Sequence, residues 1–471
     1  MRAPATRDQA DAYRFGLRRL EAALVRGDPV PLHEHLRAQR RAALVGVLLG
    51  MLGLCGAAVY ALVVPRPDWR AQAVVVGAGS GALYVVAHRP DRLVPVANLP
   101  AARLVLAALR NGGASDTDPG TAAPVLVPDD VLEPAARTAA AAVPGALAVD
   151  PGRPGPASGW AVCDEVDPDG RVVASTVVGG VAAGPPAGSD GVLLAGPDGV
   201  TWLVTAGRRH RVDLADGRVL AAYGLVRAAP RDASPALLAV LPEGPALVPP
   251  TVSGRGTPAP AGLPGRVGDV LVAQPVRGPA QYFVVLSRGV QQVPELVARM
   301  QRALSPAGSI RPVPLELVAT APLSEQLPVQ AWPPRAPRML DALQASTLCW
   351  SWAENGSGGI RFGTALPVPV GTRPVRLAGA DGAGPLLDAV AVGAGGAVRA
   401  TGPDRAAGAG PVWLISATGV GYVVADAATA AALGVAATAP APEAVLRLLP
   451  TGPALDLGAA ERLLDLGPRP R

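Results

Sequence analysis

The chain has 471 residues, of which 49% are hydrophobic and only 3% aromatic, and it is rich in Gly and Pro, with 56 and 52 residues. This composition argues against long soluble helices and predicts short strands broken by many turns, in an α+β fold that is mainly β. Residues 1–41 carry most of the net charge of +5, so no basic surface extends over a domain and nucleic acid is not expected as a partner.

Residues 1–41 are expected to form a tail with one amphipathic helix. Thr6 and Gln9 have the spacing of a capping box, and Gly27 with Pro29 marks the helix end. Apolar side chains then recur at helical spacing: Tyr13, Leu17, Leu20 and Leu24. Basic side chains share the helix with them: Arg14, Arg18 and Arg19. Two compatible hypotheses follow, a helix lying on the anionic inner leaflet or a docking helix for a partner.

Residues 42–64 contain no charged side chain and predict a transmembrane helix. At about 1.5 Å per residue the segment is roughly 35 Å long, enough to cross a hydrocarbon core about 30 Å thick. Arg37, Arg40 and Arg41 precede it, so the positive-inside rule places the N-terminus in the cytoplasm and the bulk of the chain outside the cell membrane. A cleaved signal peptide would have a shorter charged region and a shorter apolar core.

The cysteines fit this topology. Cys55 lies within the membrane segment, while Cys163 and Cys349 are the two that fall on the outer, oxidising side. We therefore expect a disulfide between Cys163 and Cys349, with two buried thiols as the alternative.

The outer region contains an internal repeat. Each unit begins with a small or turn residue, an aromatic-led β run, a Gly turn and a second β run, which is typical of a hairpin, and a helical stretch follows three of them. The second and fourth units also match at 239–247 and 447–455. This recurrence predicts one module used four times, at residues 81–111, 191–248, 278–330 and 409–458.

Further β-rich stretches are expected to assemble a separate central sheet from distant parts of the chain: 160–181, 191–194, 267–273 and 365–398. Both outer cysteines belong to the central region, so their disulfide would staple it. The remaining segments divide into a linker (65–80), three parts of a central domain (112–190, 249–277 and 331–408) and an exposed tail (459–471).

No metal or cofactor site is predicted. His33 and His35 are two residues apart, whereas a zinc-binding helix needs a His pair four apart to place both on one face. The Gly-rich run 77–82 imitates a dinucleotide-binding loop, but it opens a strand instead of a helix and is interpreted as a flexible linker. A Walker loop is excluded because all 42 basic residues are Arg and the loop requires a Lys.

Catalytic residues are likewise not predicted. The carboxylate pairs Asp129–Asp130 and Asp164–Glu165 are adjacent residues in turn-like settings, and adjacent side chains on a strand point to opposite faces. His210 is interpreted as part of a polar hairpin edge. Trp350 and Trp352 share one face of a strand, where core packing is the favoured interpretation and sugar stacking the alternative.

Several stretches together resemble the EccB family, a membrane-anchored core component of the type VII (ESX) secretion system of actinobacteria. The resemblance is carried by 13–15 and 18–20 in the tail, 160–164 and 348–352 around the cysteines, and 419–423 in the last repeat. It implies an elongated outer region with a central β domain, four flanking repeats, approximate two-fold symmetry and a Cys163–Cys349 disulfide.

The resemblance also implies a structural role in a membrane complex. The expected partners are an EccC-type ATPase, an EccD-type channel subunit, EccE, the mycosin protease, membrane lipid and a second copy of the outer domain. No enzymatic activity and no cofactor are expected. ATP hydrolysis and cell-wall binding are the alternative functions.

Overall fold

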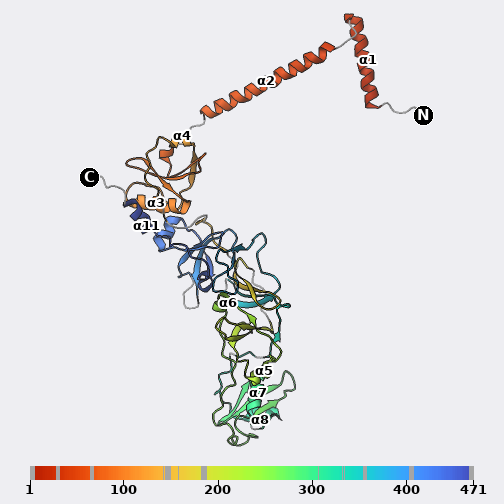
Figure 1. Ribbon diagram of the computed structural model, residues 1–471, viewed down its shortest axis with the longest axis vertical. Helices are drawn as coiled ribbons and strands as arrows, with labels where there is room; N and C mark the ends of the chain where they lie inside the picture. The colour runs from red at the N-terminus through yellow and green to blue at the C-terminus, as the bar shows by residue number, and fades with distance from the viewer. Residues whose placement is uncertain are drawn as a thin grey trace, which may run out of the picture. The chain divides into compact units, whose positions relative to one another are not determined.

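The computed structural model describes residues 6–27, 32–63, 68–141, 143, 150–156, 159–181, 188–305, 307–330, 332–333, 335–353, 358–402 and 408–465. Its chain divides into two compact units, Met1–Asp68 and Trp69–Arg471. Figure 1 shows helices alone in the first unit and the sheets in the second.

The first unit consists of two helices, α1 (Arg7–Arg26) and α2 (Leu32–Val63). The side chain of Gln9 accepts a hydrogen bond from the backbone N–H of Thr6 at 3.1 Å, as the capping-box pattern predicts. Gly27 ends α1 in the left-handed conformation, with φ of 66°, which favours glycine. Position 64, the predicted last residue of the membrane segment, lies outside the described residues. The predicted helix stop at 65–67 also lies outside them.

The second unit contains four modules that share the element order β-β-β-α-β-α. In each module, the first strand lies between two others. It pairs antiparallel with the second strand and parallel with the strand that follows the first helix. The first module has the sheet order β3-β2-β1-β4. A short 3-10 helix, Trp69–Ala71, precedes its elements: β1 (Val74–Gly77), β2 (Leu83–Ala87), β3 (Arg92–Val96), α3 (Leu99–Asn111), β4 (Pro124–Val127) and α4 (Asp129–Leu132).

The second and third modules repeat this topology, with sheet orders β10-β7-β8-β9 and β13-β12-β11-β14. The second contains β7 (Asp190–Ala195), β8 (Thr201–Thr205), β9 (Arg208–Arg211), α5 (Gly217–Tyr223), β10 (Arg231–Asp232) and α6 (Pro235–Val240). The third contains β11 (Val270–Ala273), β12 (Gln281–Leu286), β13 (Gly289–Val293), α7 (Glu295–Leu304), β14 (Ile310–Val313) and α8 (Leu315–Thr320). A distant strand, β15 (Arg338–Met339), adds to β7.

The fourth module has the order β22-β21-β20-β23. It contains β20 (Gly396–Thr401), β21 (Val412–Ile415), β22 (Gly421–Val423), α9 (Ala427–Leu433), β23 (Ala439–Pro442) and α10 (Glu443–Leu446). A final helix, α11 (Leu457–Asp465), contacts α3 of the first module and buries Ala460 completely. The segment expected as an exposed tail, 459–471, is therefore helical and packed over its first residues, because the apolar side of α11 covers α3.

The central sheet has six strands in the order β17-β16-β5-β6-β19-β18. Its strands come from three distant parts of the chain: β5 (Gly159–Val166), β6 (Val172–Gly179), β16 (Thr347–Ala353), β17 (Gly358–Gly363), β18 (Val375–Arg376) and β19 (Ala389–Ala391). Two stretches expected here, 191–194 and 267–273, instead form β7 and β11 of the modules.

Three of the modules, the first, third and fourth, are longer than the predicted repeats because each begins one strand before its predicted hairpin. β1 lies in the expected linker 65–80, β11 in the expected central part 249–277, and β20 in the expected central part 331–408. Each of these strands occupies the middle of its sheet, so the hairpin alone could not bury its apolar face.

After its second helix, each module continues into an extended segment, here called the strap, which runs beside the outer strand of the hairpin. The straps include residues 137–141, 243–247, 322–324 and 451–455. Isolated parallel bridges join the strap to this strand at Leu93 and Arg137, Arg209 and Glu243, Val290 and Leu323, and Gly421 and Thr451. An unpaired strand edge would otherwise offer free N–H and C=O groups to other chains.

The modules pack together in two pairs, and the members of each pair share a hydrophobic core. One core joins the first and fourth modules through α3, α9 and α11, and another joins the second and third through α5 and α7. A third core packs the second and fourth modules against the central sheet, with Trp202, Trp413 and Trp160 among its members. This pairing is compatible with the approximate two-fold symmetry expected from the sequence.

Candidate functional site

The membrane-spanning candidate lies within α2, at Gln39–Tyr60, and has a mean hydropathy of 2.3. In the most apolar part of this segment, no residue is buried by the rest of the chain, as expected for side chains that face lipid. Arg40 and Arg41 are exposed at its N-terminal end. Arg37 belongs to α2, but its side chain lies outside the described part of the structure.

The apolar stripe of α1 is open to solvent. Tyr13 is 70% exposed, Leu17 49%, Leu20 62% and Leu24 84%. At 3.6 residues per turn these four side chains fall on one side of the helix. Arg14 makes an exposed ion pair with Asp11 at 3.9 Å, and Arg18 is also exposed. A stripe of this kind is suited to a lipid surface or to the groove of another protein.

A disulfide joins Cys163 of β5 to Cys349 of β16. The two residues lie directly opposite each other in the antiparallel pairing of these strands, with 4.0 Å between their Cα atoms. Both are buried, together with small side chains such as Ala161 and Ala391, on one face of the central sheet. The bond therefore links two strands that are far apart in sequence.

The opposite face of the same strands carries the tryptophans. Trp160 is completely buried and donates its indole N–H to the carbonyl of Pro440 at 3.3 Å. Trp350 is 8% exposed, and Trp352 packs against the same core while remaining partly exposed. This burial favours core packing over sugar stacking.

Buried charges lie where the central sheet meets the second module. Asp164 accepts hydrogen bonds from the backbone N–H of Ser234 at 2.7 Å and from its hydroxyl at 2.6 Å. Burial outweighs these bonds and raises the pKa of Asp164 to about 6. Asp388 accepts bonds from the N–H and hydroxyl of Ser175 at 2.7 and 3.0 Å. Asp164 is thus a buried strand residue, whereas the sequence suggested a turn.

Two other sequence interpretations are wrong. His210 is only 1% exposed, because the strap of the second module covers it, and its Nδ1 lies 3.0 Å from the carbonyl oxygen of Pro245. Burial lowers the pKa of His210. The Gly-rich run 77–82 is a fixed turn, since Asp129 accepts bonds from the N–H groups of Gly79 and Ser80 at 2.7 and 2.9 Å.

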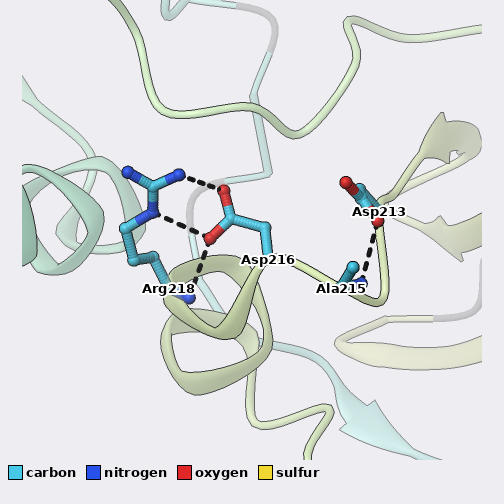
Figure 2. Close-up of polar contacts among 4 residues, drawn as sticks. All are labelled: Asp213, Ala215, Asp216 and Arg218. Atoms are coloured by element: carbon cyan, nitrogen blue, oxygen red, sulfur yellow. Dashed lines mark hydrogen bonds and ion pairs between the residues drawn. The ribbon is translucent and has the colours of Figure 1, made fainter.

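Carboxylates outside the core hold turns and helix starts in the second module. Figure 2 shows Asp213 accepting the N–H of Ala215 at 2.8 Å and Asp216 binding Arg218. Asp216 accepts from the backbone N–H of Arg218 at 2.9 Å and from its Nε at 2.8 Å, which starts α5. The hydrogen bond from Arg218 lowers the pKa of Asp216, so this carboxylate stays ionised.

The family model for "Type VII secretion system ESX-1, transport TM domain B" (EccB) matches residues 2–467. The chain belongs to the EccB family. It is 32% identical over 481 residues to the ESX-5 secretion system ATPase EccB5 of Mycobacterium marinum, covering 96% of this chain and 92% of the relative. It is 31% identical over 415 residues to the ESX-3 secretion system ATPase EccB3 of Mycobacterium tuberculosis H37Rv, covering 83% and 74%.

Solved EccB structures have the same fold. A chain of an intact ESX-5 inner membrane complex matches with a TM-score of 0.69 and 30% identity, covering 98% of this chain and 95% of that chain. The EccB3 dimer from an ESX-3 core complex matches with a TM-score of 0.69 and 28% identity, covering 83% and 99%. The predicted mainly β fold with one N-terminal apolar helix is confirmed.

The names of the EccB relatives include an ATPase activity, which requires groups that bind phosphate and activate water. The chain contains no Lys, so the usual phosphate-binding loop is excluded. Within the described ranges, no three His, Cys, Asp or Glu side chains come together in a way that could hold a metal ion.

Proposed function

We propose that this chain is the EccB-type structural component of a type VII secretion complex in the inner membrane, where it anchors and organises the extracytoplasmic side of the channel. The observation that carries the proposal is the match, over 98% of the chain, to a subunit of an intact ESX-5 inner membrane complex. One apolar helix joined to a large folded unit suits a part that ties a membrane assembly to structures outside it.

We place the N-terminus in the cytoplasm and the unit Trp69–Arg471 on the extracytoplasmic side. Arg40 and Arg41 flank the N-terminal end of the span, and basic residues are retained on the cytoplasmic side. The Cys163–Cys349 disulfide independently supports an oxidising location for the large unit.

On the cytoplasmic side, the stripe of α1 is proposed to dock onto the EccC-type ATPase or the EccD-type channel subunit, with EccE as a further partner in the membrane. On the outer side, the mycosin protease and a second copy of this chain are the proposed partners. The solved EccB3 dimer supports self-association. Lipid would cover α2.

One pair of variants tests the docking proposal. Leu20→Asp places a charge in the stripe, while Ala22→Asp places the same charge roughly on the opposite side of α1, given about 100° per residue. We expect Leu20→Asp to abolish copurification of the ATPase and channel subunits from mild detergent, and Ala22→Asp to leave it unchanged. Equal copurification with both variants contradicts the docking role and leaves α1 as a lipid-surface helix.

We propose a non-enzymatic role despite the relatives' names. Two alternatives are open to direct measurement, ATP hydrolysis and binding to the cell wall. Purified full-length protein in detergent should release no phosphate from ATP above a heat-denatured sample, and it should not sediment with isolated cell wall. Steady phosphate release that follows the protein through two purification steps would contradict the non-enzymatic role.

A further inference from the structure

A cavity of about 460 Å³ lies between the central sheet and the second module. Its wall combines the β5–β6 turn at 168–170, the segment 227–231 between α5 and α6 (Figure 1), and the segment 339–342 after β15. Small-molecule sites commonly occupy about 300–1,000 Å³ and combine apolar walls with a few polar groups. Leu193, Met339 and Leu340 supply apolar wall here.

Arg231 contributes to this wall and is only 5% exposed. Its Nη1 donates to the carbonyl of Ala345, but its buried Nε and Nη2 have no hydrogen-bond partner among the described residues. Burial lowers the pKa of Arg231 to about 10, so it remains a cation at neutral pH. The charge of Asp164 opposes this lowering of the pKa, yet the two carboxylate oxygens of Asp164 accept hydrogen bonds from Ser234.

A buried guanidinium with unused donors is unfavourable unless ordered water or a ligand completes its bonds, and the cavity beside Arg231 has room for a ligand. Arginine is suited to a carboxylate, which it binds through two parallel N–H···O bonds. The guanidinium would have to turn toward the cavity for this, because Nε and Nη2 are enclosed in the ligand-free protein.

The other charged groups of the cavity wall limit which ligands can bind. Asp169 and Asp341 are exposed carboxylates and Arg227 an exposed cation, so together with Arg231 the cavity has no net charge. A phosphate, with two negative charges, would be repelled by the carboxylates. A ligand with one carboxylate and one ammonium group would match both signs.

We propose that this cavity binds a small peptide-like zwitterion, with its carboxylate on Arg231 and its ammonium group near Asp169 and Asp341. Free short peptides carry both groups, whether their residues are D, as in fragments released from cell-wall peptides, or L. The proposal needs only the folded outer unit, and it stands or falls separately from the role in secretion.

The test uses the full-length protein in detergent, with isothermal titration and thermal unfolding as readouts. The probes are D-alanyl-D-alanine, L-alanyl-L-alanine, alaninamide, which lacks the carboxylate, and inorganic phosphate. We expect one dipeptide to bind saturably and raise the unfolding midpoint, and alaninamide and phosphate to do neither. The preferred enantiomer identifies the source of the ligand.

Arg231→Gln should weaken dipeptide binding at least about tenfold, because the carboxylate loses its charged partner. The control Arg299→Gln, on α7 and paired with Glu295, should bind as the wild type does. The effect of the dipeptide on each variant is measured against that variant's own ligand-free midpoint, because Arg231→Gln also removes the charge that compensates the buried Asp164.

Three results would overturn the proposal: no dipeptide binding, equal binding by wild type and Arg231→Gln, or binding of phosphate at least as tight as that of the dipeptide. A fall in the ligand-free midpoint of Arg231→Gln with unchanged dipeptide binding would assign Arg231 a structural role instead.

Discussion

Removal of the disulfide should destabilise the outer unit strongly. Cys163 and Cys349 are separated by 186 positions in sequence, and the chain-entropy model gives roughly 5 kcal/mol for closing a loop of that length. Alanine at both positions leaves the β5–β16 pairing in place, because the two residues are already opposite each other in register. The loss therefore falls mainly on the unfolded state, which becomes less restricted.

Urea unfolding of the full chain in detergent, followed by tryptophan fluorescence, measures this loss. With a slope of about 3 kcal/mol/M, a loss of 5 kcal/mol lowers the midpoint by about 1.7 M. The double variant Cys163→Ala/Cys349→Ala should show this shift, and the control Cys55→Ala should not. A shift of less than about 0.3 M would refute the reasoning, because the disulfide would then not restrict the unfolded chain.

Three further predictions concern the core, a buried charge and the membrane flank. Trp160→Ala should lower the free energy of unfolding by about 3–5 kcal/mol by opening a cavity at a fully buried site, and a loss below 1 kcal/mol in the same urea assay would contradict this. The pKa of Asp164 is raised from 3.8 to about 6, so the folded state binds this proton more tightly than the unfolded state does. Protonated Asp164 therefore stabilises the folded state fully below pH 3.8, and this stabilisation is lost as the pH rises through about 6. Stability measured from pH 4 to 8 should therefore fall by about 2 kcal/mol more in the wild type than in Asp164→Asn, whereas parallel curves would exclude this group as the cause. Arg40→Glu/Arg41→Glu should leave part of the chains with the outer unit inside, seen as protease resistance of that unit in spheroplasts, and unchanged digestion would show that these arginines do not set topology.

Local sequence patterns predicted the elements that depend on local physics. The capping box of α1, the uncharged run in α2 and the four hairpins depend on neighbouring residues, and the structure contains all of them, although the turn of the first hairpin, 88–91, has no Gly. The first strand of three modules was left out of its predicted repeat because it pairs across the sheet with β4, β14 or β23, which lie beyond a helix. Nothing in four apolar residues such as β1 indicates a partner so far along the chain.

The buried polar groups could not be predicted for a related reason. Asp164 is followed by Glu165 and His210 is flanked by arginines, and their burial results from α6 and from the strap at 243–247, which pack over them. Arg231 likewise became recognisable only when the cavity beside it was known. The two outer cysteines were easier, because the compartment alone made a disulfide the expected pairing.

The central claim is that this chain is a structural part of a type VII secretion complex in the inner membrane. The most direct measurement is native mass spectrometry of the tagged full-length chain after mild detergent extraction from its own cells. The account predicts a multisubunit particle that contains a large EccC-type ATPase and a polytopic EccD-type subunit. Recovery of the chain only as a monomer or homodimer, from membranes in which those two subunits are present, would contradict it.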